Sequence, residues 1–510
     1  MAAYGCLRLF VFVLTFSMDS NFKMVAKTMK GLEGCLADEL RGLGAANVEP
    51  GRRMVSFEGN LEMLYKANLC LRTALCVLKP FYSFTASDSD ELYDKVKDFD
   101  WGSLMSADST FSIDTVTYSA TFNHSRYVTY RVKDGIVDWF RDRYDKRPGV
   151  RLDEADVMIN VHIQDTKVTL SLNSSGESLH KRGWRVASTE APINEVLAAG
   201  ILLMAGYDGS QPLTDTMCGS GTFLVEAALI AANINPGVFR MDYAFRRWPD
   251  FDEELFNRLW SDDEHEREPE NIIIGGDMLA SAVQATKRNL KAAGVDKFVN
   301  VEIKKLSEWV KAPAKSGILV MNPPYGERIA APDMAELYTE IGNILKKVFT
   351  GWNAWIISLK DEYFRYIGLA PSQKIALLNG SIDCELRQYI MFAGNKRDFR
   401  AAGGKLKSLK PEVNKPKENK KKTFGRDKAF APKKSDARKE SFKDAPSHRL
   451  KKETEKRTAV NFDTPDTVSD NPLAARRSMR ALTSIKGKGP ALPKSEGPIM
   501  RSRGWKKKNS

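Results

Sequence analysis

The chain has 510 residues, of which 42% are hydrophobic, so it is long and apolar enough for more than one domain with a core of its own. The net charge of +13 is unevenly distributed: residues 401–510 contain 31 Lys and Arg against 12 Asp and Glu, whereas the first 400 residues contain 47 against 53. This division between a mildly acidic body and a strongly basic tail excludes a uniformly basic nucleic-acid-binding protein.

The amino-terminal apolar stretch and the cysteines indicate the cellular compartment. The stretch from Leu7 to Phe16 is too short to cross a bilayer and lacks a basic lead-in and a small-residue cleavage site. We interpret residues 1–17 as an over-extended translation start or leader before Met18, with a signal peptide as the alternative. The six cysteines form no CxxC pair, and no histidine stands at metal-ligand spacing. We therefore expect a cytoplasmic protein with reduced thiols, no metal and no membrane contact.

Residues 22–185 mix helical and strand patterns. Two stretches have the spacing of core-facing helices, namely GLEGCLADELRGLG at 31–44 and the stripe of Val128, Val132, Ile136, Trp139 and Phe140. The segment DVMINVHIQDTKVTLSLN alternates strictly on both sides of a polar turn, which predicts a half-buried hairpin. Its core-facing residues are Val157, Ile159, Val161 and Ile163, followed by Val168, Leu170 and Leu172.

From about residue 191 to residue 393, short β-branched runs alternate with longer helical patterns. This rhythm predicts parallel βαβ units in a doubly wound α/β sheet. Near the end of this region, Asn379-Gly380 separates two short apolar runs, and because Asn-Gly favours a two-residue hairpin, the sheet should finish with an antiparallel strand. After residue 396 the apolar periodicity is lost, so we expect residues 396–510 to be a disordered basic tail.

A glycine-rich turn is the first candidate binding element. In QPLTDTMCGSGTFLVEAALIAA a short strand ends at Asp215, and a helix is predicted from about Thr222 to Ala232. Gly219 and Gly221 allow the backbone to approach a ligand, and the helix amino end presents unpaired N–H groups to an anion. No Lys-Ser/Thr pair follows, so this is not a P-loop, and the anion could be the carboxylate of an amino-acid-like cofactor. An ordinary tight strand-to-helix turn is the alternative.

The next strand, NIIIGGD, ends at Asp277 and precedes a helix predicted to run to about Ala293. A carboxylate at the end of such a strand can accept hydrogen bonds from both ribose hydroxyls of a nucleoside, or it can cap the following helix. Asp215 and Asp277 are 62 residues apart, against roughly 20 between the turn and the acid in a compact dinucleotide-binding unit. We expect an insertion of about residues 233–270 to account for the difference.

The stretch GILVMNPPYGERI places Asn322, Pro323, Pro324 and Tyr325 after an apolar strand, where ligands bind in open sheets. Because the prolines restrict the backbone, the Asn side-chain oxygen and a proline carbonyl can be held as two acceptors for one amino group, and Tyr325 offers a face on which a base can stack. This arrangement suits methylation of an exocyclic amine, since fixed acceptors stabilise the charge that grows on its nitrogen and hold it in line with a methyl donor. A strand stopped by a Pro-Pro turn is the alternative.

The motifs DTMCGSGT, GGD and NPPYGER resemble those of class I S-adenosylmethionine-dependent methyltransferases acting on amino groups of nucleic acids. More narrowly, SLHKRGWR (178–185), APINEVLAAGIL (191–202) and NGSIDCEL (379–386) resemble the bacterial 23S ribosomal RNA guanine-N2 methyltransferases that carry a THUMP domain, the L half of the fused K/L enzymes. The resemblance covers about residues 22–395 and does not include the second methyltransferase module that some relatives carry.

This resemblance implies a fold and a partner. The expected regions are an α+β ferredoxin-like segment at 18–75, a THUMP RNA-binding domain at 76–178, and a Rossmann-like methyltransferase domain at 179–395 whose seven-stranded sheet has a reversed last strand. The implied cofactor is S-adenosyl-L-methionine, and the implied partner is large-subunit ribosomal RNA or its precursor. The oligomeric state stays open.

The resemblance also assigns site residues. Asp215, Gly219 and Gly221 would line the methionine end of the cofactor, together with Cys218 of the same turn, and Asp277 would bind its ribose. The segment from Asn322 to Tyr325 would form the amino-acceptor and base-stacking site.

Two positions depart from the family pattern. Thr216 stands where relatives usually have proline. Relatives commonly carry an acid before the fourth strand that contacts the adenine amino group, whereas the aligned residue here is Lys305. Glu302 or Glu308 could substitute through a shifted register, so the residue that recognises adenine stays open.

Lys181, Arg182, Trp184 and Arg185 interleave charge with an aromatic ring, a pattern that can combine phosphate contact with stacking on RNA. A linker that packs its tryptophan on a domain surface is the alternative. The tail should add salt-sensitive RNA affinity, or else be a solubilising extension. Two other functions stay open: adenine-N6 or glutamine-N5 methylation, which also uses Asn-Pro-Pro-Tyr, and a non-catalytic RNA-binding assembly factor.

Overall fold

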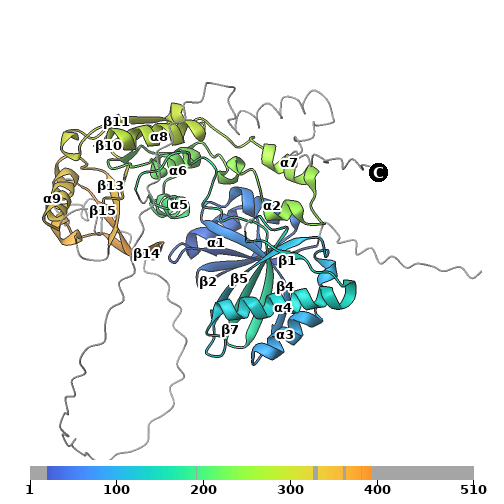
Figure 1. Ribbon diagram of the computed structural model, residues 1–510. Coiled ribbons are helices and arrows are strands. Elements are labelled where there is room, and N and C mark those ends of the chain that lie inside the picture. The colour runs from blue at the N-terminus through green and yellow to red at the C-terminus, as the bar shows by residue number, and fades with distance from the viewer. Residues whose placement is uncertain are drawn as a thin grey trace, which may run out of the picture. The chain divides into compact units, whose positions relative to one another are not determined.

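Two β-sheets organise the described residues, one in an amino-terminal and one in a carboxyl-terminal region (Figure 1). The structure is a computed structural model, and it describes residues 20–392 except for 153, 191, 325–330, 360–362 and 381. The extension expected at 1–17 and the basic tail expected at 396–510 lie outside the described residues.

The amino-terminal sheet has eight strands in the order β2-β3-β1-β4-β8-β7-β5-β6. They are β1 (Phe22–Thr28), β2 (Ala46–Gly51), β3 (Met54–Gly59), β4 (Ala74–Thr85), β5 (Thr110–Tyr118), β6 (Gly149–Val150), β7 (Val157–Gln164) and β8 (Lys167–Asn173). The 12-residue strand β4 pairs with β1 on one side and β8 on the other. The segments predicted to be ferredoxin-like and THUMP therefore share one continuous sheet.

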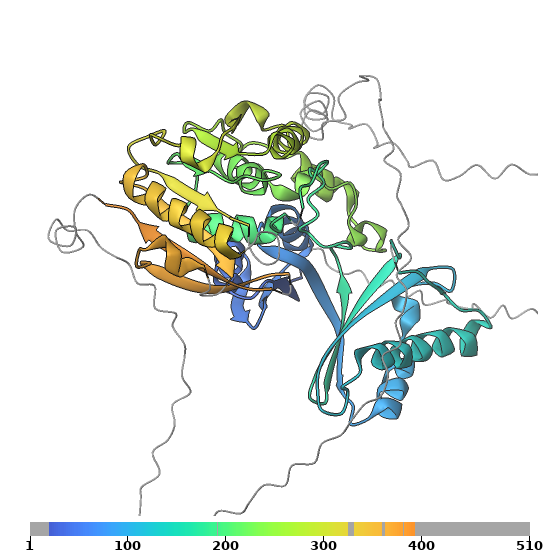
Figure 2. The same ribbon diagram turned by 60° about the vertical axis from the view of Figure 1, so that its left-hand side comes forward.

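The helices of this region are α1 (Glu33–Gly42), α2 (Leu61–Cys70), α3 (Ser89–Asp98), α4 (Ser125–Tyr144) and the short η1 (Trp101–Ser103). Two of them, α1 and α4, coincide with the predicted helical stretches. Side-chain oxygens of Asn60 and Asp88 accept hydrogen bonds from the first turns of α2 and α3, which fixes where these helices begin. Helices α3 and α4 lie side by side (Figure 2), and the apolar stripe of α4 is buried, as predicted.

The predicted hairpin is confirmed, since β7 and β8 pair antiparallel and their core-facing residues are buried. The opposite face is more covered than a half-buried pattern predicts. Asn160 is 3% exposed there. Its amide donates to Asp114 Oδ2 at 2.9 Å and accepts from Lys27 Nζ at 3.1 Å. A hydrogen-bonded polar cluster therefore fills part of the face that alternation alone assigns to solvent.

The carboxyl-terminal sheet has seven strands in the order β11-β10-β9-β12-β13-β15-β14. They are β9 (Leu213–Asp215), β10 (Ile273–Asp277), β11 (Val299–Ile303), β12 (Ile318–Met321), β13 (Asn353–Leu359), β14 (Gln373–Asn379) and β15 (Ile382–Ile390). Strand β15 runs antiparallel to both β13 and β14, so the predicted reversed last strand is confirmed. It lies between those two strands, and β14, which precedes it in the chain, forms the edge of the sheet. The chain turns back at Gly380 between β14 and β15.

The helices of this region alternate with its strands. They are α5 (Glu195–Met204), α6 (Thr222–Ala231), α7 (Glu253–Ser261), α8 (Ala280–Ala292) and α9 (Ala331–Lys347), with the short helices η2 (Pro236–Phe239), η3 (Ala244–Arg247), η4 (Asp296–Phe298), η5 (Leu306–Glu308) and η6 (Phe364–Ile367). Helix α6 is buried along its whole length, which fits its continuous apolar sequence.

The insertion predicted at about 233–270 contains η2, η3 and α7 and explains the long spacing between the first two motifs. It packs against the amino-terminal region through aromatic side chains. The Tyr65 ring of α2 lies 4.7 Å from Phe245 and 5.8 Å from Phe256, centroid to centroid, and the Tyr65 hydroxyl accepts the Asp252 N–H at 2.9 Å. The insertion thus increases the apolar contact between the two regions.

Candidate active site

Three strand ends meet at one edge of the carboxyl-terminal sheet. The central strand β9 pairs in parallel with β10 and β12, so that Asp215 stands opposite Gly275 on one side and Val320 on the other. Asp277 and Asn322 follow those partners by two residues and therefore lie at the same carboxyl edge. Residues predicted from three separate motifs come together there.

The glycine-rich turn between β9 and α6 needs its two glycines. Gly219 has φ +55° and Gly221 has φ +80°, a left-handed region that side chains disfavour. A Cβ at Gly221 would also lie 2.6 Å from Thr286 Cγ2 of α8. The Thr286 hydroxyl donates to the Gly219 carbonyl at 2.8 Å, which fixes the turn against α8. Among the described residues, no side chain caps the amino end of α6, so an anionic group can bind its first N–H groups.

Asp277 connects this turn to the start of α8. Its Oδ2 accepts the Gly219 N–H at 2.9 Å, and its Oδ1 accepts the Leu279 N–H at 2.9 Å. The residue that caps α8 is Leu279, so the alternative that Asp277 is the helix cap is wrong. The carboxylate instead joins the turn to the residue before α8, and a nucleoside's hydroxyls would compete there for its oxygens.

Asp215 is buried beside this turn. It is 1% exposed, and its Oδ1 accepts the Met217 N–H at 3.1 Å. Burial, with a smaller contribution from the negative charge of Asp277, raises the pKa of Asp215 to about 8. Such a carboxyl is poised to ionise when a cation binds beside it. Cys218, in contrast, packs its side chain in the hydrophobic core, where burial raises the pKa of the thiol and Sγ lies 3.7 Å from Thr286 Oγ1, and its contact with the cofactor stays a prediction.

Asn322 holds an unsatisfied acceptor. Its Oδ1 is buried and has no hydrogen-bond partner within the described part of the chain. The four residues of β12 that precede it are fully buried, and Pro323 after it is buried as well, so the side chain is presented from a rigid base. An unpaired buried oxygen costs about 1–3 kcal/mol, and a donor such as an amino group would remove that cost. Tyr325, predicted to stack on a base, lies outside the described residues.

Comparisons with known proteins agree with this geometry. Three protein-family models match the chain. The family model of an RMKL-like methyltransferase domain matches residues 182–388, the RlmL ferredoxin-like domain matches residues 23–78, and the THUMP domain matches residues 86–173. A putative RNA methyltransferase of Synechocystis is 37% identical over 72% of this chain and 96% of its own length. The chain belongs to the RMKL-like methyltransferase family.

Two further relatives are informative about this family member. The ribosomal RNA large subunit methyltransferase K/L of Syntrophotalea carbinolica is 39% identical over 73% of this chain and 54% of its own length. The chain thus spans about half the length of the K/L relatives it matches. A solved structure described as SMU.472, a putative methyltransferase complexed with SAH, has 28% identity and a TM-score of 0.65, covering 74% of this chain and 100% of the other.

Apolar side chains at the same sheet edge were missed by the sequence reasoning. Met278 is 64% exposed, Leu279 56% and Ile303 62%, and all three follow or end the strands β10 and β11. Exposed apolar groups beside Asp277 could flank a flat aromatic ring. The signal available in the sequence was the Met-Leu pair directly after the strand-end acid Asp277.

Lys305, the residue at the position where the resemblance led us to expect an acid, is exposed after β11. The backbone N–H of Lys305 donates to Glu308 Oε2 at 2.9 Å, so the Glu308 carboxylate lies against the backbone of Lys305. Lys304 Nζ lies 4.3 Å from the centroid of the Trp309 ring. Of the two acids considered, Glu308 is therefore the one in contact with Lys305.

Four residues of the linker at 181–185 were predicted to contact RNA, and two of them are buried. Arg182 is 3% exposed and Trp184 1% exposed, so the prediction that they contact phosphates and bases is wrong. The Trp184 ring packs in the core of the carboxyl-terminal region, as the packed-linker alternative requires. Lys181 is exposed and pairs with Glu177, and its contact with RNA stays a prediction.

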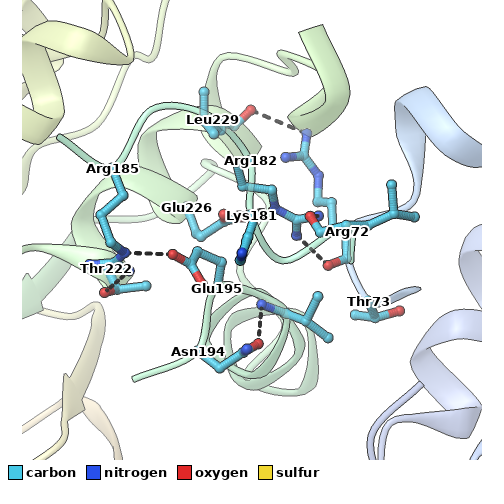
Figure 3. Close-up of polar contacts among 12 residues, drawn as sticks. Arg72, Thr73, Lys181, Arg182, Arg185, Asn194, Glu195, Thr222, Glu226 and Leu229 are labelled. Atoms are coloured by element: carbon cyan, nitrogen blue, oxygen red, sulfur yellow. Dashed lines mark hydrogen bonds and ion pairs between the residues drawn. The ribbon is translucent and has the colours of Figure 1, made fainter. Parts of the chain in front are cut away.

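Arg182 belongs to a buried network that crosses between the two regions (Figure 3). Its Nε lies 3.3 Å from Glu226 Oε1 on α6, and its guanidinium donates to the Arg72 carbonyl. Arg72 donates in turn to the carbonyls of Leu229 at 3.3 Å and Ile234 at 2.7 Å, at the carboxyl end of α6. The helix that carries the glycine-rich turn is therefore held by arginines from the linker and the amino-terminal region.

The described residues contain no helix with both the length and the apolar character to span a membrane. In the same part of the chain, no three His, Cys, Asp or Glu side chains are grouped as a metal ion would require.

Proposed function

We propose that this protein uses S-adenosylmethionine to methylate the N2 amino group of a guanine in large-subunit ribosomal RNA. The observation that carries the proposal is the unsatisfied, buried Oδ1 of Asn322 at the carboxyl edge shared with Asp215 and Asp277. Its support from comparison is membership of a methyltransferase family, together with relatives named ribosomal RNA large subunit methyltransferase K/L.

The residues at this edge fit the cofactor group by group. The glycine-rich turn and the amino end of α6 suit its carboxylate, and the buried carboxyl of Asp215 suits its ammonium. Asp277 offers acceptors to the ribose, and the exposed Met278 and Leu279 offer apolar contact to adenine. The cofactor supplies an activated methyl group when bound. A solved neighbour is described as a complex with SAH, which agrees with this assignment.

Asn322 would act on the amino group that receives the methyl. Its Oδ1 accepts one N–H of that group, and a carbonyl of the Pro323-Pro324 pair accepts the other, so that the nitrogen is held in line for transfer. Both oxygens stabilise the positive charge that develops on nitrogen, and no strong base is needed. Tyr325 would stack on the guanine. A base inside paired RNA would first have to be flipped out or met in an unfolded assembly intermediate.

Methyl incorporation by the full chain tests this function. Unmodified ribosomal RNA, transfer RNA, DNA and ribosomal protein are offered separately with labelled S-adenosylmethionine, and the product is identified by nucleoside or amino-acid analysis. We expect N2-methylguanosine in large-subunit RNA. Label in DNA or on glutamine would show that the proposed substrate is wrong, while the proposed role of Asn322 would still stand. No label and no cofactor binding would favour a non-catalytic RNA-binding factor.

The Asn322→Ala variant isolates the acceptor. We expect transfer to fall by at least about a hundredfold, because one fixed acceptor for the developing charge is lost, while the affinity for SAH changes less than about twofold. Asn300→Ala, which removes an exposed asparagine from the edge strand β11 of the same sheet, is the matched control and should leave both quantities unchanged. Near-normal turnover of Asn322→Ala would refute the acceptor role.

A further inference from the structure

Arg185, predicted to contact RNA, uses its guanidinium within the protein. Its Nε donates to Glu195 Oε1 at 2.6 Å, and its Nη2 donates to Thr222 Oγ1 at 2.8 Å (Figure 3). Its Nη1 donates to Ser220 Oγ at 2.9 Å. The Arg185 side chain is 19% exposed and that of Glu195 7%. All three nitrogens of the guanidinium are therefore engaged, each with a different residue.

Two of these partners flank Gly221. Ser220 precedes it and Thr222 follows it, and Gly221 itself has the left-handed φ of +80°. Glycines at such positions leave a turn many conformations when nothing holds it. One planar guanidinium binds the side chains before and after Gly221. It therefore restricts the turn to the conformation seen here, in which the turn leads directly into the amino end of α6.

A second side chain, Asn289, also holds this turn. Asn289 of α8 donates to the carbonyl of Ser220 at 2.9 Å and to that of Ala187 at 2.8 Å, and its Oδ1 accepts the N–H of Ala187 at 2.9 Å. The linker that follows Arg185 is thus tied to the turn as well. Because Glu195 neutralises Arg185, the effect of Arg185 on the turn is geometric more than electrostatic.

We propose that Arg185 is a positioning residue for the methionine end of the cofactor, acting through the side chains of Ser220 and Thr222. The inference rests on the proposed function, because it concerns the turn assigned there to the cofactor carboxylate. Arg185 itself does not touch the cofactor. Its contribution is to hold the turn ready before binding, so that the ordering cost does not have to be met when the cofactor arrives.

Isothermal titration of the full chain with SAH tests the proposal. Arg185→Lys keeps the charge but cannot reach three acceptors at once, so we expect the dissociation constant to rise about tenfold. The double variant Ser220→Ala/Thr222→Val keeps Arg185 and should give a similar rise. Because both changes remove the same contacts, combining them should add less than about a further twofold.

A matched control is available at the other end of α6. Arg267 donates to the carbonyl of Ala231, the last residue of α6, at 2.9 Å and to that of Asp208 at 2.6 Å, so Arg267→Lys also removes a guanidinium contact to this helix, but far from the turn. We expect its SAH affinity to match the wild type. Steady-state kinetics give a second readout: Arg185→Lys should raise the KM for the methyl donor with kcat at saturation nearly unchanged.

The outcomes separate this inference from the proposed function. A wild type that binds no SAH overturns the cofactor site and with it this inference. A wild type that binds SAH while Arg185→Lys binds it equally well leaves the proposed function standing and overturns the positioning role. Fully additive effects in the combined variant, or a loss confined to RNA affinity, would also overturn it, because Arg185 would then act by another route.

Discussion

The raised pKa of Asp215 predicts a pH-dependent affinity for the cofactor. Asp215 is fully buried with one backbone hydrogen bond, and burial raises its pKa to about 8. The ammonium of the methionine end requires this carboxyl in its charged form. Below pH 8 most of the free protein holds Asp215 protonated, so binding has to include loss of that proton. Affinity should therefore increase as the pH rises toward 8.

The magnitude follows from the ionised fraction. With a pKa of about 8, about 1% of Asp215 is ionised at pH 6 and about 9% at pH 7. The dissociation constant for SAH should fall about ninefold over that interval, which corresponds to about 1.3 kcal/mol. An α-amino group titrates near 8, so the ligand stays largely protonated in this window.

Calorimetric titration with SAH at pH 6.0, 6.5 and 7.0 measures this slope. The control is Asp215→Asn, which keeps the shape and cannot ionise. We expect the variant to bind with no pH dependence in this window and to approach the wild type most closely at pH 6. A wild-type dissociation constant that stays flat between pH 6 and pH 7, or a variant that keeps the slope, would refute the reasoning.

The remaining predictions concern stability and the turn. Gly221→Ala should weaken SAH binding at least about tenfold and lower the free energy of unfolding by about 1–2 kcal/mol. The reason is that alanine is strained at this left-handed φ and its Cβ would press on Thr286. Calorimetric titration measures the affinity, and urea unfolding measures the stability. Unchanged affinity would contradict it. Arg182→Ala should cost about 3–5 kcal/mol by leaving buried Glu226 without its partner, whereas Arg141→Ala, from an exposed ion pair, should cost less than about 1 kcal/mol. Equal losses in urea unfolding would argue against this network.

Local patterns were sufficient to predict several of the helices and strands. The alternation of β7 and β8 and the apolar stripe of α4 could be identified directly, because strand and helix periods are properties of neighbouring residues. Asn379-Gly380 predicted the reversed strand β15 for the same reason, since a two-residue hairpin is a local structure.

The order of the strands within the sheet was harder to predict from the sequence. The sequence gives no direct sign that β15 lies between β13 and β14, because strand order depends on contacts between distant segments. The exposed apolar residues Met278 and Leu279 also drew no attention, since single apolar residues are common at surfaces. They become informative only beside Asp277 at the shared sheet edge.

The linker is where sequence and tertiary structure differ most. Its charged and aromatic residues look solvent-exposed in isolation, yet Arg182 meets Glu226 at a separation of 44 residues and Arg72 at a separation of 110. Arg185 likewise finds Ser220 and Thr222 on another element. The sequence by itself determined the types and positions of the chemical groups and the elements that carry them. Only the tertiary structure decided which of these groups are buried and paired, because burial and long-range pairing arise from packing that no local spacing records.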